Sequence, residues 1–168
     1  MDKKINLLIT GGAGFIGSNL VEHFLEDDRV GLVRVLDNLS NGYIENIQEF
    51  FDHPRFEFIQ GDIRDYDSVL NAMKDCKAVI HLAALIGIPY SYRSPLAYIK
   101  TNLEGTYNVL EASKNLKIKN TIITSTSEVY GSAQYLPMDE KHPVNSQSPY
   151  AASKASADQL ALSYYRSF

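Results

Sequence analysis

The sequence predicts an α/β fold, with a doubly wound parallel sheet and helices on both of its faces. Short apolar runs alternate with helical patterns, each run is nearly continuous, and a glycine-rich turn follows the first run. Strands buried on both faces of a parallel sheet have this near-continuous apolar character. The runs are residues 5–10, 32–36, 56–59, 78–82 and 121–124. Right-handed crossovers between them predict a strand order of 3-2-1-4-5.

Helical patterns fill the intervals between these runs. Ile16, Leu20 and Phe24 recur every four residues, which places their side chains on one face of a first helix. Pro95 suits the first turn of a later, long helix. The further helical patterns cover residues 43–51, 66–74, 95–115 and 148–168.

The end of the sequence carries no helix stop signal. The final stretch, ALSYYRSF, contains no Gly, Asn or Pro, the residues at which helices commonly end. We therefore expect residues 1–168 to form one domain that is truncated within its last helix. The alternative is that a helix simply ends the domain, which is common.

The composition is that of an ordinary globular protein. Of 168 residues, 45% are hydrophobic and 21% are charged, which excludes wholesale disorder. The formal net charge of −4 argues against a nucleic-acid-binding protein. No apolar run approaches the roughly 18 residues that span a bilayer, so no membrane segment is predicted. Residues 1–10 fit a short buried strand better than a signal peptide, because glycines follow their short apolar stretch.

Cysteine and histidine usage bears on the compartment and on metal binding. Cys76 is the only cysteine, so an internal disulfide is excluded and a reducing, cytoplasmic compartment is expected. His23, His53 and His142 have no partners at metal-ligand spacing, so no metal site is predicted. His81, near the end of the fourth predicted strand, is interpreted as a packed strand histidine rather than a catalyst.

A glycine-rich turn joins the first predicted strand to the first helix. Gly12, Gly14 and Gly17 satisfy the pattern GxGxxG, and Gly11 with the last two also satisfies GxxGxxG. Glycines allow backbone to approach a pyrophosphate closely, and the helix N-terminus behind them favours phosphate. Asp37 ends the second strand 20 residues after Gly17, where a carboxylate can bind the ribose hydroxyls of NAD and repel the 2′-phosphate of NADP. The alternative is a structural glycine turn with an N-cap aspartate.

Two further strand ends contribute to the same edge of the sheet. Asp62 follows the third strand, where it could accept a hydrogen bond from an adenine amino group or, equally, cap the next helix. After His81, the fourth strand continues into small residues, Ala83 and Ala84, which allow close approach of a cofactor.

A second group of polar residues follows the fifth strand. Residues 125–131, STSEVYG, place hydroxyls and the Glu128 carboxylate at the expected ligand crevice, although such a loop is often only solvated. Tyr150 and Lys154 lie four residues apart, on one face of the last helix. A free tyrosine titrates near pH 10, but a neighbouring ammonium and a nicotinium ring would favour its phenolate. Tyr150 is therefore a plausible acid/base for alcohol oxidation.

Together these residues resemble the extended short-chain dehydrogenase/reductases, the NAD-dependent epimerase/dehydratase family, and most closely its nucleotide-sugar 4,6-dehydratases. The motifs are TGGAGFIG at 10–17, DNLSNG at 37–42, GDIRD at 61–65, HLAA at 81–84, TNLEGTYNVLEA at 101–112, STSEVYG at 125–131 and YAASK at 150–154. The resemblance implies a Rossmann fold with bound NAD and a smaller C-terminal substrate domain, which this sequence lacks. The implied cofactor contacts are Gly11, Gly14, Phe15, Ile16, Gly17, Asp37, Asn38, Asp62, Ile63, Leu82, Ala83, Ala84, Asn102, Tyr150 and Lys154.

The resemblance also implies a mechanism. Tyr150 takes the proton of the sugar C4 hydroxyl during oxidation at C4, Glu128 removes the C5 proton, water leaves from C6, and hydride returns to C6. Thr126 would hold O4, and Lys154 would orient the ribose and tune Tyr150. The dehydratases typically have Thr-Asp-Glu or Thr-Ser-Glu in this loop, and this sequence has the second form. Because Ser127 stands where the first form has an aspartic acid, the proton donor for the C6 hydroxyl is undecided between Glu128 acting twice and a bound water. An N-acetylglucosamine nucleotide is the expected substrate, and NAD binding with weak or absent turnover is expected of these residues alone.

Alternatives and an assembly follow from the same resemblance. A 4-epimerase of the same family and a non-catalytic NAD-binding protein are the alternative functions. A homodimer through the two long helices is expected, as a four-helix bundle across a two-fold axis. The apolar positions that fit this bundle, and fit packing within one chain equally well, are Leu103, Tyr107, Leu110, Leu160 and Tyr164.

Overall fold

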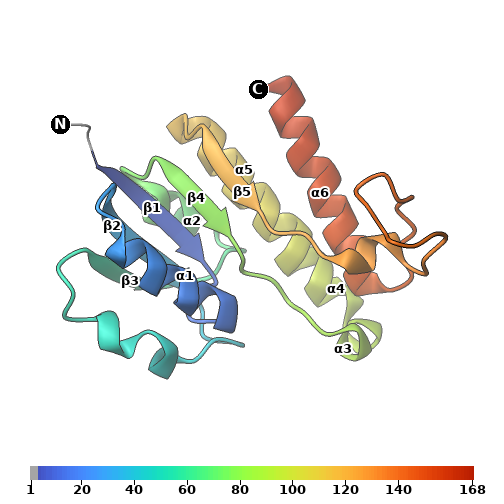
Figure 1. The fold of residues 1–168 in the computed structure, drawn as a ribbon, viewed down its shortest axis with the longest axis horizontal. Coiled ribbons are helices and arrows are strands. Elements are labelled where there is room, and N and C mark those ends of the chain that lie inside the picture. The colour runs from blue at the N-terminus through green and yellow to red at the C-terminus, as the bar shows by residue number, and fades with distance from the viewer. Residues whose placement is uncertain (1–3) are drawn as a thin grey trace.

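The computed structural model describes residues 4–168; residues 1–3, which the sequence analysis placed in the same domain, lie outside the described residues. A parallel sheet of five strands, in the order β3-β2-β1-β4-β5, confirms the predicted fold class and strand order (Figure 1). The strands are β1 (Ile5–Thr10), β2 (Val30–Asp37), β3 (Phe56–Gln60), β4 (Ala78–His81) and β5 (Asn120–Ile123). Because all the strands are parallel, their carboxyl ends share one edge of the sheet.

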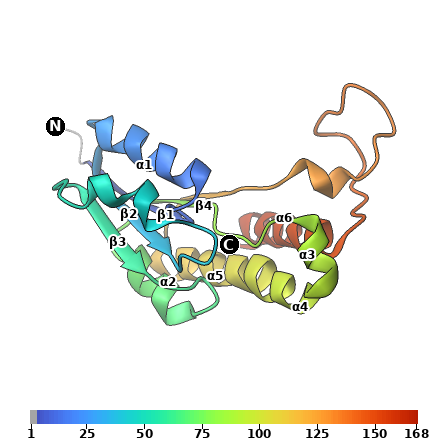
Figure 2. The same cartoon turned by 90° about the horizontal axis from the view of Figure 1, so that it is seen from below.

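Helices cover both faces of the sheet, as Figure 2 shows. The helix α1 lies on one face, and α2, α5 and α6 lie on the other. The short helices α3 and α4 lie beyond the carboxyl end of β4 and pack against α6. The bounds are α1 (Phe15–Glu26), α2 (Tyr66–Met73), α3 (Ile88–Arg93), α4 (Pro95–Tyr98), α5 (Gly105–Leu116) and α6 (Pro149–Ser167).

The core consists of two apolar clusters, one on each face of the sheet. Leu7 and Ile9 of β1 belong to the cluster that packs under α1 with Val21. Leu8, between them, belongs to the opposite cluster with Met73 of α2. Successive strand side chains point to opposite faces, so a strand covered on both sides needs apolar residues at every position. This double burial explains why the apolar runs of β1, β2 and β4 are continuous rather than alternating, whereas the edge strand β5 leaves Ile122 60% exposed.

The predicted helix over residues 43–51 is wrong. This segment forms two separate 3₁₀ turns, Ile44–Asn46 and Gln48–Phe50, and the buried Ile47 lies between them. Its start is attached to the glycine-rich turn, because the Asn46 side chain donates a hydrogen bond of 2.8 Å to the Ala13 carbonyl. Burial of Ile47 and this attachment override the weak helical pattern.

The predicted long helix over residues 95–115 is divided into three parts. A π-helical segment, Ile99–Glu104, separates α4 from α5. The buried Asn102 in this segment is hydrogen-bonded to backbone outside its own helix, and such π-helical insertions frequently occur at functional sites. The preceding α3 was not predicted, since six residues are too few for a clear helical pattern.

The last helix, α6, starts where the sequence predicts. The Ser148 hydroxyl accepts a hydrogen bond of 3.0 Å from the Ala151 amide, and Pro149 occupies the first helical position. Serine as N-cap with a following proline is a strong helix start. The cap therefore determines where α6 begins, which places Tyr150 in its first turn.

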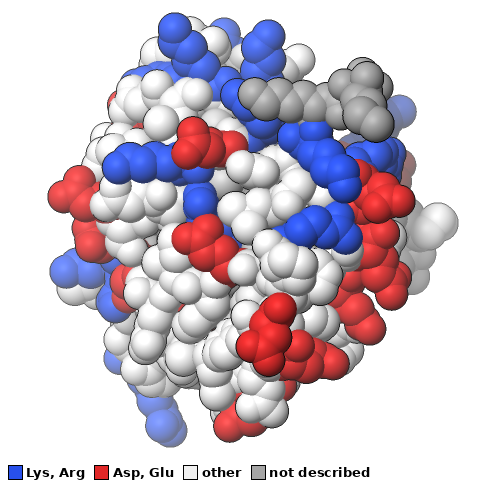
Figure 3. Space-filling model, turned by 90° about the vertical axis from the view of Figure 1, so that its left-hand side faces the viewer, with Lys and Arg blue, Asp and Glu red and all other residues white. Residues whose placement is uncertain are grey.

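Acidic and basic side chains are interspersed on the face of the molecule that Figure 3 shows. Within residues 4–168, no helix is both long and apolar enough to cross a lipid bilayer. In the same part of the chain, no group of three or more His, Cys, Asp or Glu side chains is arranged to hold a metal ion.

We expect Leu8→Ala to destabilise the fold by about 2–5 kcal/mol, because Leu8 is fully buried and its removal leaves a cavity in the core. Urea unfolding monitored by circular dichroism measures the change. The matched control is Leu96→Ala in α4, where the leucine is 60% exposed and a loss below about 0.5 kcal/mol is expected. Equal losses in the two variants would contradict the assignment of Leu8 to the core.

Candidate functional site

The glycine-rich turn lies in close contact with the carboxyl end of β4. Gly11 has a φ of +73°, and a Cβ atom there would lie 2.7 Å from the Ala83 amide nitrogen. A Cβ atom on Gly17 would collide with the Gly11 carbonyl oxygen. Gly14, the N-cap of α1, supplies no side-chain hydrogen bond to the first turn. The first amides of α1 therefore remain available to an anion, and the turn leaves room for one.

Asp37 ends β2 beside this turn. One of its carboxylate oxygens accepts a hydrogen bond of 3.0 Å from the Ala13 amide, and the other accepts one of 2.9 Å from the Leu39 amide. The carboxylate is buried but keeps unused acceptor positions on both oxygens. The structure thus brings Asp37 against the glycine-rich turn, where a ribose that follows a pyrophosphate would lie.

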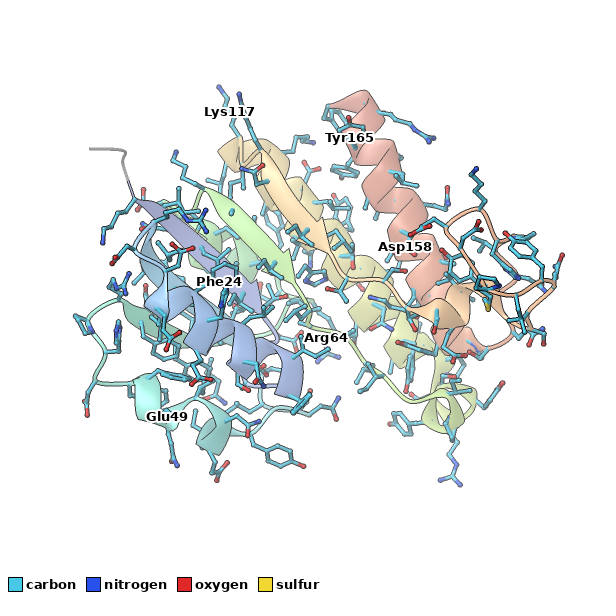
Figure 4. The ribbon with its side chains drawn as sticks, in the orientation of Figure 1. Phe24, Glu49, Arg64, Lys117, Asp158 and Tyr165 are labelled. Carbon is cyan, nitrogen blue, oxygen red and sulfur yellow. The ribbon has the colours of Figure 1, made fainter. Side chains whose placement is uncertain are left out.

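Asn38, Asp62 and Arg64 form a polar cluster at the ends of β2 and β3. The Asn38 amide donates a hydrogen bond of 3.0 Å to Asp62, and the Arg64 guanidinium donates two, at 2.7 and 3.0 Å. The Arg64 hydrogen bonds lower the pKa of Asp62 to about 2, so this carboxylate is an acceptor near neutral pH. Figure 4 shows Arg64 beyond the carboxyl end of the sheet.

The alternative that Asp62 caps the next helix is wrong. The N-cap of α2 is Asp65, whose side chain accepts a hydrogen bond of 3.1 Å from the Asp67 amide. Asp62 precedes that cap and accepts from the Arg64 amide instead. Its carboxylate is therefore directed to Asn38 and Arg64 rather than into α2.

The remaining predicted cofactor contacts differ in how exposed their side chains are. Phe15 and Ile16 are exposed on the first turn of α1, whereas the Ile63 side chain is buried in the core. Leu82 and Ala84 are half-buried in the segment that follows β4. From Ile63 only the backbone remains to contact a ligand, because its side chain packs among core residues.

His81 is enclosed beneath the site. Its Nδ1 lies 2.7 Å from the Thr10 hydroxyl, and its Nε2 lies 3.1 Å from the Thr106 hydroxyl, which donates to the Asn102 carbonyl. Because the Thr106 proton is committed to that carbonyl, Nε2 must carry the histidine proton and donate it to Thr106. Burial, together with the smaller effect of the Lys154 charge, lowers the pKa of His81 to about 3. His81 is thus a neutral packed histidine, as the sequence analysis expected.

Asn102 connects the segment after β4 to α6. Its side-chain oxygen accepts a hydrogen bond of 2.8 Å from the Leu85 amide. Its side-chain nitrogen donates hydrogen bonds of 2.9 Å to the Leu85 carbonyl and to the Ser153 hydroxyl. The amide group is fully used inside the protein. Asn102 therefore holds the shape of the site, and its role as a cofactor contact stays a prediction.

Tyr150 and Lys154 lie on α6 close to the end of β5. The Lys154 ammonium donates a hydrogen bond of 2.5 Å to the Thr124 carbonyl, and burial lowers the pKa of this lysine. The Tyr150 ring packs edge-on against Tyr98, with ring centroids 6.1 Å apart. Within residues 4–168, the Tyr150 hydroxyl donates to no protein acceptor, which leaves it available to a ligand.

The turn after β5 carries Glu128, the carboxylate predicted to remove the C5 proton. A 3₁₀ turn, Ser127–Tyr130, is capped by Thr126, whose hydroxyl accepts a hydrogen bond of 3.3 Å from the Glu128 amide. The exposed Glu128 lines a hollow of about 280 Å³. The other lining residues are Ile88, Tyr92, Gly131, Ser132, Gln147 and Ser148. A substrate in this hollow would contact Glu128 next to the start of α6.

Sequence reasoning missed several residues that hold these groups. Arg64, Tyr98 and Asp158 each contact a predicted site residue or its immediate neighbour. Asp158 could have been found from spacing, since it follows Lys154 by four residues on the same helix face. Tyr98 had no such signal, because its role depends on the fold of α3 and α4.

Comparisons with known proteins place the chain in a family. Residues 8–168 match the family described as GDP-mannose 4,6 dehydratase. The chain is 41% identical over 168 residues to a dTDP-glucose 4,6-dehydratase of Streptomyces antibioticus, covering 96% of this chain and 49% of that protein. The chain thus spans about half the length of the curated relatives it matches.

Solved structures of both reaction types are similar to this chain. One is DesIV, a dTDP-glucose 4,6-dehydratase from Streptomyces venezuelae with NAD bound, with a TM-score of 0.92 at 36% identity over 97% of this chain and 52% of that one. Another is a UDP-N-acetylglucosamine 4-epimerase from Methanobrevibacter ruminantium, with a TM-score of 0.91 at 37% identity over 99% of this chain and 52% of that one. These matches confirm the resemblance to NAD-dependent epimerases and dehydratases, and the chain belongs to the GDP-mannose 4,6 dehydratase family.

Proposed function

We propose that this chain binds NAD across the carboxyl edge of its sheet and carries the catalytic residues of a nucleotide-sugar 4,6-dehydratase. The observation that carries the proposal is the proximity of two groups: the Tyr150–Lys154 face of α6 is fastened to the end of β5, from which the Glu128 turn begins. An acid/base for C4 and a base for C5 are thereby held on neighbouring segments.

The cofactor site fits NAD on three counts. The glycine-rich turn has no room for side chains, the first turn of α1 lacks a side-chain cap, and Asp37 offers unused acceptor positions. A pyrophosphate would lie at α1, a ribose at Asp37 and an adenine near Asp62. When bound, NAD supplies the hydride-transfer chemistry at C4 and C6 of the sugar.

The protein side chains then account for the proton movements. Tyr150 takes the proton from the C4 hydroxyl, and the Lys154 ammonium favours the phenolate form of Tyr150. Thr126 holds O4, and a ketone at C4 acidifies the C5–H bond that Glu128 deprotonates. Ser127 is too weak an acid to protonate the leaving C6 hydroxyl, so Glu128 or a bound water would supply that proton.

A 4-epimerase of the same family is the second candidate. It is supported by the similar identities of this chain to a 4-epimerase, 37%, and a 4,6-dehydratase, 36%, of known structure. Glu128 favours the dehydratase, because proton removal at C5 is needed for loss of water and has no part in epimerisation at C4. A non-catalytic NAD-binding protein would have no use for the buried Tyr150–Lys154 pair.

The substrate, the assembly and the compartment complete the proposal. We propose an N-acetylglucosamine nucleotide as substrate and the cytoplasm as location. We further propose a homodimer in which α5 and α6 face a second copy. Leu110 is buried within one chain and Tyr164 donates a hydrogen bond of 2.8 Å to Glu111, so these two positions serve internal packing. Of the other three positions, Leu103 and Leu160 are half-buried, and Tyr107 on α5 is 44% exposed, so Tyr107 is the one most open to a partner.

Replacing Asp37 by Asn should narrow the preference for NAD over NADP about tenfold, because the amide no longer repels a 2′-phosphate and binds ribose hydroxyls more weakly. The ratio of the two dissociation constants, measured by calorimetry, tests this, because a general loss of protein stability would affect both constants alike. Asp52→Asn, an exposed site with the same charge change, is the control and should leave the ratio unchanged. An unaltered ratio in the Asp37 variant would remove Asp37 from the cofactor site.

In the complete natural protein, Glu128→Gln should reduce dehydration by about 10²–10⁴-fold and leave NAD affinity unchanged, because the amide cannot accept the C5 proton. Mass spectrometry after incubation with nucleotide sugars measures the product, which is lighter by one water. Glu140→Gln, another exposed carboxylate in the following loop, is the control. Products of unchanged mass from the unsubstituted protein would favour the epimerase instead.

Static light scattering should give twice the mass of one chain, and Tyr107→Asp should shift the protein toward the monomer, because a carboxylate would be buried at the interface. Tyr165→Asp, at a residue that is 86% exposed near the end of α6, provides a comparison for added charge alone. A monomeric unsubstituted chain, or a dimer unaffected at Tyr107, would count against this interface.

A further inference from the structure

A third polar side chain continues the Tyr150–Lys154 face of α6. Asp158 follows Lys154 by four residues, so Tyr150, Lys154 and Asp158 lie one above another along the helix. Its carboxylate accepts a hydrogen bond of 2.5 Å from the Ser125 hydroxyl. Figure 4 shows Asp158 on the side of α6 that is directed toward β5.

Lys154 and Asp158 attach α6 to two consecutive residues that directly follow β5. Lys154 donates to the carbonyl of Thr124, and Asp158 accepts from the side chain of Ser125. Ser125 in turn directly precedes Thr126, the cap of the turn that carries Glu128. The two contacts therefore determine how the turn after β5 stands relative to Tyr150.

The charge of Lys154 also needs a partner. Lys154 is 6% exposed, and burial of an ammonium favours its neutral form. The neighbouring His81 on β4 offers Lys154 no negative charge, because burial keeps this histidine neutral. Within residues 4–168, the Asp158 carboxylate is the charge that raises the pKa of Lys154.

We propose that Asp158 is a positioning residue of the active site: held by Ser125, its carboxylate keeps the buried Lys154 ammonium charged and locks α6 to the end of β5. The inference rests on the proposed function, in which the Lys154 ammonium favours the Tyr150 phenolate and binds the ribose. A carboxylate at position 158 thereby acts on the acid/base through Lys154, without touching substrate or cofactor.

The test measures Lys154 itself, with ¹³C-labelled lysine and NMR titration of this chain. In Asp158→Asn the acceptor for Ser125 is retained but the charge is lost, so the midpoint of the Lys154 titration should fall by about one pH unit. Asp158→Glu restores the charge and should restore the midpoint. Glu49→Gln, which removes an exposed charge in the segment between β2 and β3, should leave it unchanged.

Ser125→Ala separates the charge from the hydrogen bond. If Asp158 has a purely structural role, Ser125→Ala and Asp158→Asn should both lower the melting temperature. Neither variant should then shift the Lys154 midpoint more than the control Glu49→Gln does. That result would overturn the proposal. If Asp158→Asn does not fold, the unsubstituted chain still decides: the Lys154 signal must respond when Asp158 is protonated in acid, and no response would equally overturn it.

The same titration distinguishes a failure of this inference from a failure of the proposed function. The Lys154 midpoint is measured without NAD or substrate, so it reports on Asp158 even if no cofactor binds. With NAD bound, the upper pH limit of binding should move down in Asp158→Asn by the same interval as the Lys154 midpoint. Failure of NAD to bind any variant would refute the proposed function and leave the Lys154–Asp158 coupling measurable.

Discussion

The close approach of the glycine-rich turn to the carboxyl end of β4 is the constraint on which the rest of the site depends. Backbone meets backbone there, since a Cβ atom on Gly11 would lie 2.7 Å from the Ala83 nitrogen. This contact brings Thr10 onto His81 and onto the Ala83 amide, at 2.7 and 3.2 Å. From β4, hydrogen bonds run through Thr106 and Asn102 to Ser153 on α6. The end of β1, the end of β4 and the start of α6 are thus parts of one hydrogen-bonded framework.

The framework places polar groups in an order that matches an extended dinucleotide. Asp62 and Asn38 lie at the ends of β3 and β2, the glycine-rich turn follows β1, and Tyr150 stands beside the end of β5. Because neighbouring strands in a sheet are about 4.8 Å apart, the strand order sets the spacing of these polar groups along the edge where a ligand would lie. The doubly wound strand order alone therefore determines the sequence in which these groups follow one another along the edge.

Sequence patterns predicted the parts of the molecule that local rules control. The five strands, the glycine-rich turn and the Ser148 cap of α6 follow from apolar runs, backbone freedom and capping chemistry. The π-helical segment at Asn102 and the 3₁₀ turns around Ile47 were not predictable in this way. Both depend on bonds or burial involving residues distant in the sequence, such as Leu85 and Ala13, which no window of neighbouring residues contains.

The same division holds within the site and bears on its chemistry. Tyr150, Lys154 and Asp158 share one helix face, and an acid/base with a charged neighbour would serve a dehydratase and an epimerase alike. Glu128 lines the hollow beside the start of α6, and in the proposed function it is the group that deprotonates C5, which only the dehydratase reaction needs. Under the proposed function, the choice between the two reactions therefore depends on the short turn Ser127–Tyr130, whereas the framework would serve either one.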